Sequence, residues 1–154
     1  MADPYEIRDG RFLISTDQAK IDVNYVHSFL KNAYWSPGIP HATVEKALRH
    51  SLSFGVYETD DAGKVKRQVG SARVVTDYAT FGYISDVFID PDYRNLGLAE
   101  KLVNALLAHP DLQGLRRICL TTRDAQPLYL KCGFTPPKYP ARWLEVYDEN
   151  LYKD

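Results

Sequence analysis

Residues 86–99, with the sequence DVFIDPDYRNLGLA, decide the fold of this chain. The apolar run ends at Asp90-Pro91, which predicts the end of a strand, because proline has no N–H group to continue a ladder. Residues 98–108 repeat apolar side chains at helical spacing without a breaker and therefore predict an amphipathic helix. The first N–H groups of such a helix lack internal partners, and its dipole adds about half a positive charge there. This strand–loop–helix unit predicts a site for an anion, unless the helix start binds only water.

Hydrophobic periodicity extends the prediction to a chain of mixed strands and helices. Strands are expected at residues 12–16, 54–58, 69–76, 83–89, 116–120 and about 143–147, and helices at 21–35, 44–52, 98–108 and 126–131. The strands at 54–58 and 69–76 flank a turn and predict an antiparallel hairpin. A strand, a helix and a strand follow one another over residues 83–120, which predicts a parallel pair. We therefore expect a mixed sheet with helices on its faces.

Composition narrows the class of protein. The 154 residues predict a single domain, 1–154, and 45% hydrophobic with 25% charged residues is typical of globular proteins. A net charge of −1 argues against nucleic acid as a partner. Two cysteines favour a reducing compartment over a disulfide framework. Neither a signal peptide nor a long apolar run is evident, so we expect a cytoplasmic protein with no membrane segment.

Several familiar sites are disfavoured by their missing motifs. No Gly-Lys-Ser/Thr follows the glycine loop and no G-x-G-x-x-G is present, which argues against nucleotide hydrolysis and dinucleotide binding. The four histidines lack the spacing of metal ligands, so no metal is expected. Cys132 has no histidine near it in the sequence and is expected to be a packed thiol and not a nucleophile.

Two motifs resemble the signatures of the GNAT acetyltransferases. Arg94-x-x-Gly97-x-Ala99 is similar to the R/Q-x-x-G-x-G/A signature, and Ala125–Phe134 (AQPLYLKCGF) is similar to A-x-x-x-Y-x-x-x-G-F. The order of elements is also similar over nearly the whole chain, and residues 34–38, 72–77 and 85–88 resemble a subgroup of small stand-alone members. The resemblance implies an α/β (α+β) fold. Its GNAT-like sheet is mixed and mostly antiparallel, with a central parallel βαβ unit and helices on both faces.

The resemblance also implies where the cosubstrate acetyl-CoA binds. Amides of the helix start would hold its pyrophosphate, and the pantetheine arm would lie between strands 83–89 and 116–121, which splay apart. The implied cofactor-binding residues are Val87, Phe88, Ile89, Arg94, Asn95, Leu96, Gly97, Leu98, Ala99 and Thr122, the last at a position where the family often has Asn. Tyr129 matches the tyrosine that hydrogen-bonds or protonates the departing thiolate. Without the resemblance, its ring would simply pack on the sheet.

Acetyl transfer to an amine needs a neutral nucleophile. With a pKa of about 10.4, about one lysine-like amine in two thousand is neutral at about pH 7, so a base must take the proton directly or through water. Asp86 is the leading candidate, because its charge lies in an apolar strand whose alternation places Ile84, Asp86 and Phe88 on one side. The alternative is an ion pair with Arg73 of the neighbouring strand. Tyr83 is a weaker candidate for the base.

The acceptor side of the site is less constrained. Tyr34, Trp35 and the loop up to Pro40 either wall the acceptor pocket, as an aromatic cage for a cation, or cap the sheet. Arg73 is assigned to the same substrate-binding set, and Arg142 with Trp143 could line the pocket from the last strand.

The sequence thus predicts an N-acetyltransferase that moves an acetyl group from acetyl-CoA to a primary amine by direct attack in a ternary complex. The acceptor is a small-molecule or peptide amine, and the resemblance is also consistent with a homodimer. Two alternatives are a non-catalytic acyl-CoA-binding sensor and a scaffold module with no affinity for coenzyme A.

Overall fold

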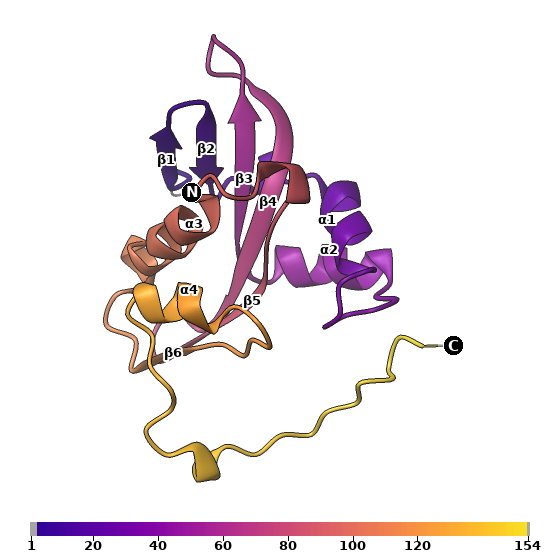
Figure 1. Cartoon of the computed structure of the whole chain (residues 1–154), viewed down its shortest axis with the longest axis vertical. Helices are drawn as coiled ribbons and strands as arrows, with labels where there is room; N and C mark the ends of the chain where they lie inside the picture. Colours follow the sequence, from indigo (N-terminus) through magenta and orange to yellow (C-terminus); the bar gives the residue numbers. More distant parts are fainter. Residues whose placement is uncertain (1–2, 154) are drawn as a thin grey trace.

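The computed structural model describes residues 3–153 (Figure 1). Its strands form one sheet in which neighbours along the chain are neighbours in space, in the order β1-β2-β3-β4-β5-β6. The strands are β1 (Glu6–Asp9), β2 (Phe12–Ser15), β3 (Leu52–Thr59), β4 (Val65–Thr76), β5 (Phe81–Ile89) and β6 (Arg117–Cys119). The β5–β6 pair is parallel and the other neighbouring pairs are antiparallel. The expected mixed, mostly antiparallel sheet is confirmed.

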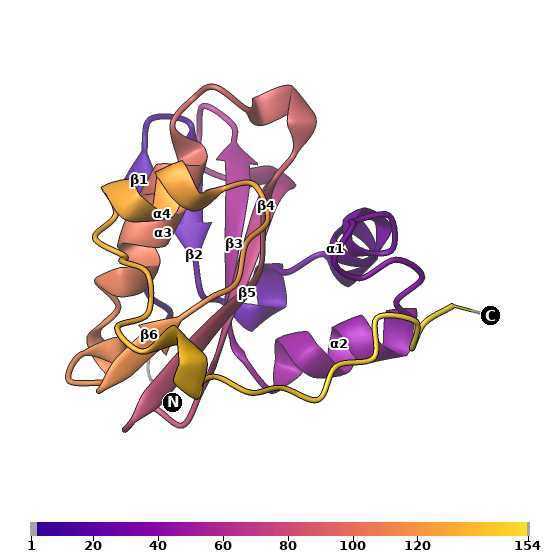
Figure 2. The ribbon, with the colours of Figure 1, turned by 60° about the horizontal axis from the view of Figure 1, so that its bottom comes forward.

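Helices cover both faces of this sheet (Figure 2). They are α1 (Val23–Leu30), α2 (His41–Arg49), α3 (Leu98–Leu107) and α4 (Gln126–Lys131). The pair α3 and α4 lies on one side of the strands, and α1 with α2 lies on the other (Figures 1 and 2). Within residues 3–153, no helix is both long enough and apolar enough to cross a membrane.

Each face has its own apolar core. Leu102 and Leu106 of α3 pack with Phe54 and the other buried side chains of the central strands. Val26 and Leu30 of α1 pack with side chains of α2 and with Phe88 of β5. Burial of these side chains is the main force that fixes the layers. Ile84 belongs to the first core and Phe88 to the second, so β5 contributes buried side chains to the cores on both faces of the sheet.

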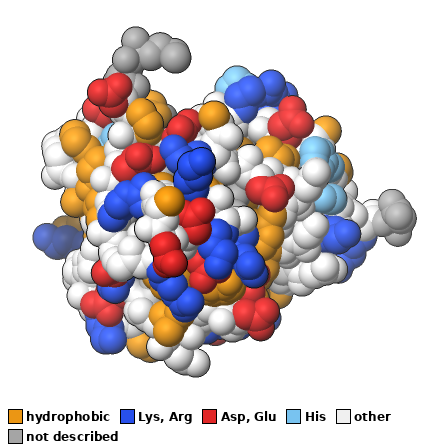
Figure 3. Space-filling view, turned by 90° about the horizontal axis from the view of Figure 1, so that it is seen from above, with side chains coloured by type: hydrophobic (Ala, Val, Ile, Leu, Met, Phe, Trp, Pro, Cys, Tyr) orange, Lys and Arg blue, Asp and Glu red, His pale blue; other side chains and the backbone are white. Residues whose placement is uncertain are grey.

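The face of the molecule seen in Figure 3 has no large patch of side chains that all carry the same charge. There, Lys and Arg side chains are interspersed with Asp and Glu (Figure 3). Such a mixed surface agrees with the near-zero net charge of the sequence.

Several predicted bounds were wrong at the N-terminal half. The helix expected at 21–35 is shorter: it is α1, Val23–Leu30. It begins after Asp22, whose carboxylate accepts the N–H of Tyr25 at 3.0 Å. The helix expected at 44–52 is α2, which begins after Pro40, and Leu52 already belongs to β3. Strand β1 was not predicted, because its four residues alternate too briefly to give a signal.

The strand expected at about 143–147 does not form in the described chain. Residues 135–151 are all exposed and no strand is assigned to them. The parallel β5–β6 pair therefore lies at the edge of the sheet instead of at its centre.

Candidate functional site

The site begins where β5 and β6 separate. Their pairing covers Phe81–Tyr83 of β5 and Arg117–Cys119 of β6 and then stops. Strand β5 continues to Ile89, so in the described chain its second half has a strand neighbour only on the β4 side. The expected splay is present, and it leaves those backbone N–H and C=O groups of residues 84–88 that face away from β4 free to pair with an extended ligand. The Ile89 carbonyl accepts a hydrogen bond from Arg94 Nε at 3.3 Å.

A bulge lies within this free half of β5. Ser71 pairs with Phe88 and Arg73 with Ser85, so β5 carries one more residue than β4 between these two pairs. Asp86 occupies the left-handed region with φ 57°, which is costly for a residue with a Cβ. A bulge reverses the alternation of the side chains beyond it. The expectation that Ile84, Asp86 and Phe88 share one side was therefore wrong.

The start of α3 presents backbone N–H groups to the same opening. Gly97 is the N-cap residue with φ 77°, and no side chain caps the helix. The first hydrogen bond of the helix is donated by Lys101 N to the Gly97 carbonyl oxygen, at 3.2 Å. The N–H groups of the residues before Lys101 therefore have no partner within the helix and are directed out of its end. A hollow of about 220 Å³ lies against them, lined by Ile89, Tyr93, Arg94, Asn95, Gly97, Leu98, Ala99, Glu100 and Leu128. This arrangement suits an anion.

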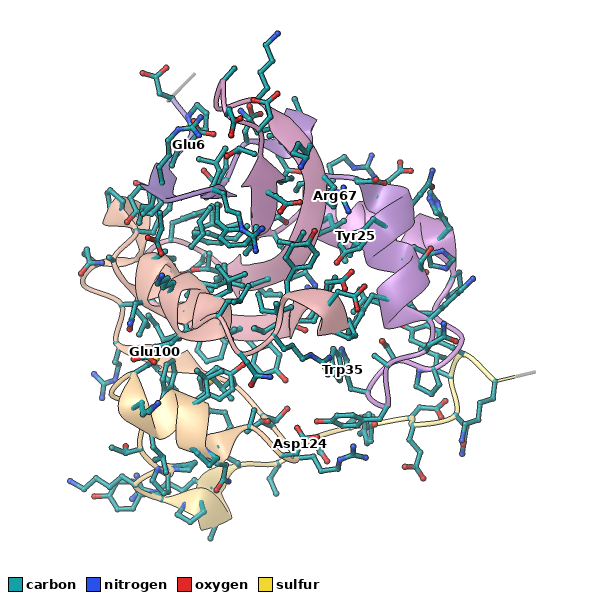
Figure 4. The ribbon with its side chains drawn as sticks, turned by 45° about the horizontal axis from the view of Figure 1, so that its top comes forward. Glu6, Tyr25, Trp35, Arg67, Glu100 and Asp124 are labelled. Carbon is teal, nitrogen blue, oxygen red and sulfur yellow. The ribbon has the colours of Figure 1, made fainter. Side chains whose placement is uncertain are left out.

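A larger cavity continues from this hollow. It measures about 480 Å³ and is lined by Phe29, Ala33, Tyr34, Trp35, Val87, Phe88, Ile89, Arg94, Ala99, Asp124, Ala125, Leu128 and Tyr129. The two share Ile89, Arg94, Ala99 and Leu128, so they form one continuous groove. In Figure 4, Trp35 and Asp124 lie on opposite sides of the groove, from the loop after α1 and from the segment before α4.

Tyr129 is a buried tyrosine that lines this groove. Its side chain is 8% exposed, and its ring meets Phe134 edge-on with centroids 5.7 Å apart. Burial raises the pKa of Tyr129 to about 12, and the nearby Cys132 and Tyr34 act in the same direction. The hydroxyl therefore keeps its proton at neutral pH and can donate a hydrogen bond into the groove.

Aromatic side chains form the opposite wall. Phe29 stacks on Phe88 with centroids 3.8 Å apart, and Trp35 lies between Phe29 and Tyr34. The Tyr34 hydroxyl accepts the backbone N–H of Arg123 at 3.2 Å, and the Arg123 guanidinium lies 3.6 Å above the Tyr34 ring. The loop after α1 is thus tied to the segment before α4 across the groove.

Behind this wall lies a partly buried ion pair. Arg73 Nε donates to Asp86 Oδ2 at 2.7 Å, and Trp35 Nε1 donates to Asp86 Oδ1 at 2.8 Å. The Arg73 guanidinium also reaches the hydroxyl groups of Ser51 and Ser85. The pair that the sequence offered as an alternative for Asp86 is therefore formed. Neither Asp86 nor Arg73 lines the groove, and a role for Asp86 as the base stays a prediction.

Other predicted residues lie outside the groove. Thr122 Oγ1 accepts the N–H of Ala125 at 3.0 Å and shapes the turn before α4. Tyr83 shares a hydrogen bond with Thr121, and Trp143 lies under Arg117. The sequence did not point to several lining residues. Apolar ones such as Phe29 resemble ordinary core positions, and charged ones such as Asp124 resemble ordinary surface positions, so nothing in their spacing distinguishes them.

Comparisons with known proteins all find acetyltransferases. Residues 50–136 match the family model described as "Acetyltransferase (GNAT) domain". The chain is 34% identical over 139 residues to the "Putative acetyltransferase FG08082" of Gibberella zeae, covering 79% of this chain and 77% of that protein.

Solved structures agree. A crystal structure of a "putative acetyltransferase belonging to the gnat family" from Xanthomonas campestris is 44% identical with a TM-score of 0.85, covering 93% of this chain and 97% of that one. A predicted acetyltransferase from Clostridium acetobutylicum, solved with acetyl-CoA, shares the fold at 18% identity and a TM-score of 0.59, covering 81% and 86%.

The Arg73–Asp86 pair predicts a large stability effect. Arg73→Met leaves the Asp86 carboxylate, whose side chain is 11% exposed, without its cation. We expect a loss of about 3 kcal/mol in the free energy of unfolding, the lower end for a broken buried pair, since Trp35 still donates to the carboxylate. Urea unfolding measures this loss in the free energy of unfolding. The control Lys131→Met removes an exposed pair with Glu100 and should cost less than about 1 kcal/mol. Equal losses in the two variants would contradict the prediction.

Proposed function

Because this chain belongs to the GNAT acetyltransferase family, we propose that it transfers an acetyl group from acetyl-CoA to a primary amine by direct attack in a ternary complex. The observation that carries the proposal is the continuous groove. It runs from the N–H groups of α3, past the open half of β5, to the Tyr129 hydroxyl. A phosphate group, an extended amide chain and a thioester follow one another in acetyl-CoA in the same order.

The residues present fit that substrate at two points. The uncapped start of α3, with Gly97 in the left-handed region, suits a pyrophosphate. Val87, Phe88 and Ile89 line the groove from the half of β5 that lacks a second strand neighbour, and their backbone groups suit the amides of the pantetheine arm. The fold neighbour from Clostridium acetobutylicum was solved with acetyl-CoA, which supports the same ligand here.

The reaction needs little from the protein beyond alignment. The amine nitrogen attacks the thioester carbonyl carbon, the new C–N bond forms, and the C–S bond breaks as the amine proton leaves to water. Free N–H groups in the bulged half of β5 are positioned to stabilise the developing oxyanion.

Tyr129 acts on the departing sulfur. Its pKa of about 12 lies well above the value of about 8.5 for an ordinary thiol, so complete transfer of its proton to a thiolate is uphill. We therefore assign it as a hydrogen-bond donor that stabilises negative charge on the sulfur as the C–S bond breaks. Water then supplies the proton that the free thiol gains.

The acceptor enters between the aromatic wall and the start of α4. Tyr34 and Trp35 offer ring faces, and Asp124 offers a carboxylate on the other side of the groove. This combination suits an amine that arrives as a cation and loses its proton before attack. We assign Arg73 and Asp86 the role of positioning residues, since they hold Trp35 in this wall without lining the groove.

Tyr129→Phe tests the hydrogen bond to sulfur. We expect kcat to fall by about 10²-fold, the lower end for removing one hydrogen-bond donor to a developing negative charge, with little change in the KM for acetyl-CoA. Free-thiol release with a panel of amines measures both. Tyr78→Phe, at an exposed tyrosine in the turn between β4 and β5, is the control and should keep full activity. Acetyl-CoA binding without thiol release from any amine would instead favour the sensor.

Ala99→Glu tests the anion site, because the new charge should affect the stability of the helix and the affinity for coenzyme A in opposite directions. Ala99 packs against the core of α3, so both larger side chains can cost stability. A carboxylate in the first turn of α3 is favourable for the helix dipole, so the Glu variant should be at least as thermally stable as the Gln variant. The same charge repels a pyrophosphate, so the Kd for coenzyme A should rise at least about tenfold above that of the uncharged variant Ala99→Gln. Calorimetry of both variants measures this difference. Equal affinities would place the phosphates elsewhere.

Asp86→Asn separates the positioning role from the role of a base. Positioning predicts a fall in kcat/KM of less than about tenfold, an unchanged acidic limb of the pH profile, and a similar loss in Arg73→Met. A base would lose about 10²-fold or more together with the acidic limb. The pH dependence of kcat/KM for both variants decides between them.

A further inference from the structure

The larger cavity of the groove has two ends with different linings. One end is shared with the hollow at the start of α3 and includes Arg94. The other end, which we call the acceptor end, belongs to the larger cavity alone and is lined by Phe29, Ala33, Tyr34, Trp35, Asp124 and Tyr129. Trp35 and Asp124 lie on opposite sides of it (Figure 4). The groups at this end decide which class of amine it can hold.

The acceptor end has one charged lining residue, and that residue is acidic. Within residues 3–153, the charged side chains that line the larger cavity are Arg94 and Asp124. Arg94 lies at the shared end, where its Nε donates to the Ile89 carbonyl at 3.3 Å. A carboxylate or phosphate on the acceptor would therefore lose water at the acceptor end without gaining a cation, which is costly. An ammonium group would instead meet the Asp124 carboxylate.

Arg123 does not supply the missing cation, because its side chain is used outside the cavity. Its guanidinium lies 3.6 Å from the centre of the Tyr34 ring, and its Nη2 lies 3.5 Å from Asp124 Oδ2. The Arg123 side chain is 65% exposed and does not line the cavity. Such an exposed ion pair is weak, and it uses Oδ2, which leaves Oδ1 of Asp124 for an ammonium group.

The remaining lining of the acceptor end is mostly aromatic. Phe29 stacks on Phe88 with centroids 3.8 Å apart, and the Trp35 ring lies 6.2 Å from that of Phe29. Because the Trp35 indole N–H already donates to Asp86, Trp35 offers an acceptor its ring and no hydrogen-bond donor. Aromatic rings pack on other rings, and their faces attract cations. This wall therefore favours a flat apolar group that lies next to an ammonium nitrogen.

A bridge between two side chains crosses the groove at the acceptor end. Tyr34 comes from the loop after α1, and Arg123 comes from the segment before α4. They are joined by the 3.2 Å hydrogen bond from Arg123 N to the Tyr34 hydroxyl and by the stacked guanidinium. Tyr34 is 43% exposed, so the bridge stands at the rim of the groove. An acceptor within a peptide brings its neighbouring residues to this rim, whereas a small molecule can enter end-on.

We propose that the acceptor is a small primary amine carried on an aromatic or other flat apolar group, with no carboxylate and no phosphate. Asp124 pairs with the ammonium group of the arriving amine, and the rings of Phe29 and Trp35 hold its apolar part. This proposal rests on the acetyl transfer proposed above and names the class of its acceptor.

Phenethylamine, phenylalaninamide and phenylalanine test the chemical class. They share a ring and a primary amine, but only phenylalanine has a carboxylate next to the nitrogen, and the amide controls for its size. At about pH 6.5 all three carry their amine proton. In the presence of coenzyme A, we expect the Kd of phenethylamine to be at least about tenfold below that of phenylalanine, with the amide closer to phenethylamine. Calorimetry measures binding without any need for turnover.

Asp124→Asn tests the partner of the ammonium group. We expect the Kd of phenethylamine to rise at least about tenfold, because a hydrogen bond between two charged groups is lost. The Kd of acetyl-CoA should not change. The control Asp61→Asn makes the same substitution at an exposed position in the turn between β3 and β4 and should alter neither value.

The outcomes separate the acceptor class from acetyl transfer itself. Phenethylamine binding in the expected order without thiol release from any amine would support this acceptor end and refute the transfer. Thiol release that is faster with a lysine-containing peptide or with phenylalanine than with phenethylamine would confirm the transfer and overturn the acceptor class. No measurable binding of phenethylamine, or an unchanged Kd in Asp124→Asn, would also overturn it.

Discussion

The separation of β5 from β6 after three paired residues is the constraint on which the site depends. Had the two strands paired to their ends, backbone groups of one strand would satisfy those of the other and nothing extended could bind between them. A bulge at Asp86, in the pairing of β5 with β4, also turns Phe88 away from the core of α3 and into the core of α1 and α2. The sheet thereby gives up regular pairing at the place where the proposed ligand needs free N–H and C=O groups.

The groove combines two electrostatic environments with different physical origins. At the start of α3, the charge comes from aligned peptide dipoles and unpaired N–H groups, so no lysine is needed to attract an anion. Around Tyr129, burial raises the pKa of the hydroxyl to about 12, so the group is a weaker acid than an ordinary tyrosine and acts as a hydrogen-bond donor. The ion pair of Arg73 with Asp86 adds a third element, since it fixes the Trp35 ring from behind the wall. Membership of the GNAT family and this geometry support the same chemistry from independent directions.

The C-terminal segment 135–151 shows how a strand-forming sequence can remain unpaired in the described chain. Residues 143–147 have strand propensity, but the prolines before them and the contact of Tyr152 with α1 and α2 hold them away from the sheet. Local preference and tertiary placement therefore disagree for this segment.

The sequence by itself determined the elements that rest on local signals: the strand, loop and helix over residues 86–99, the helix at 126–131 and the two motifs of the family. Only the tertiary structure decided the bulge in β5, the partner of Asp86, the lining of the groove and the position of residues 135–151. The physical reason is separation along the chain. Trp35 and Asp86 lie 51 residues apart, and no local pattern encodes a hydrogen bond across that distance. Such contacts exist only after the cores on both faces of the sheet have packed.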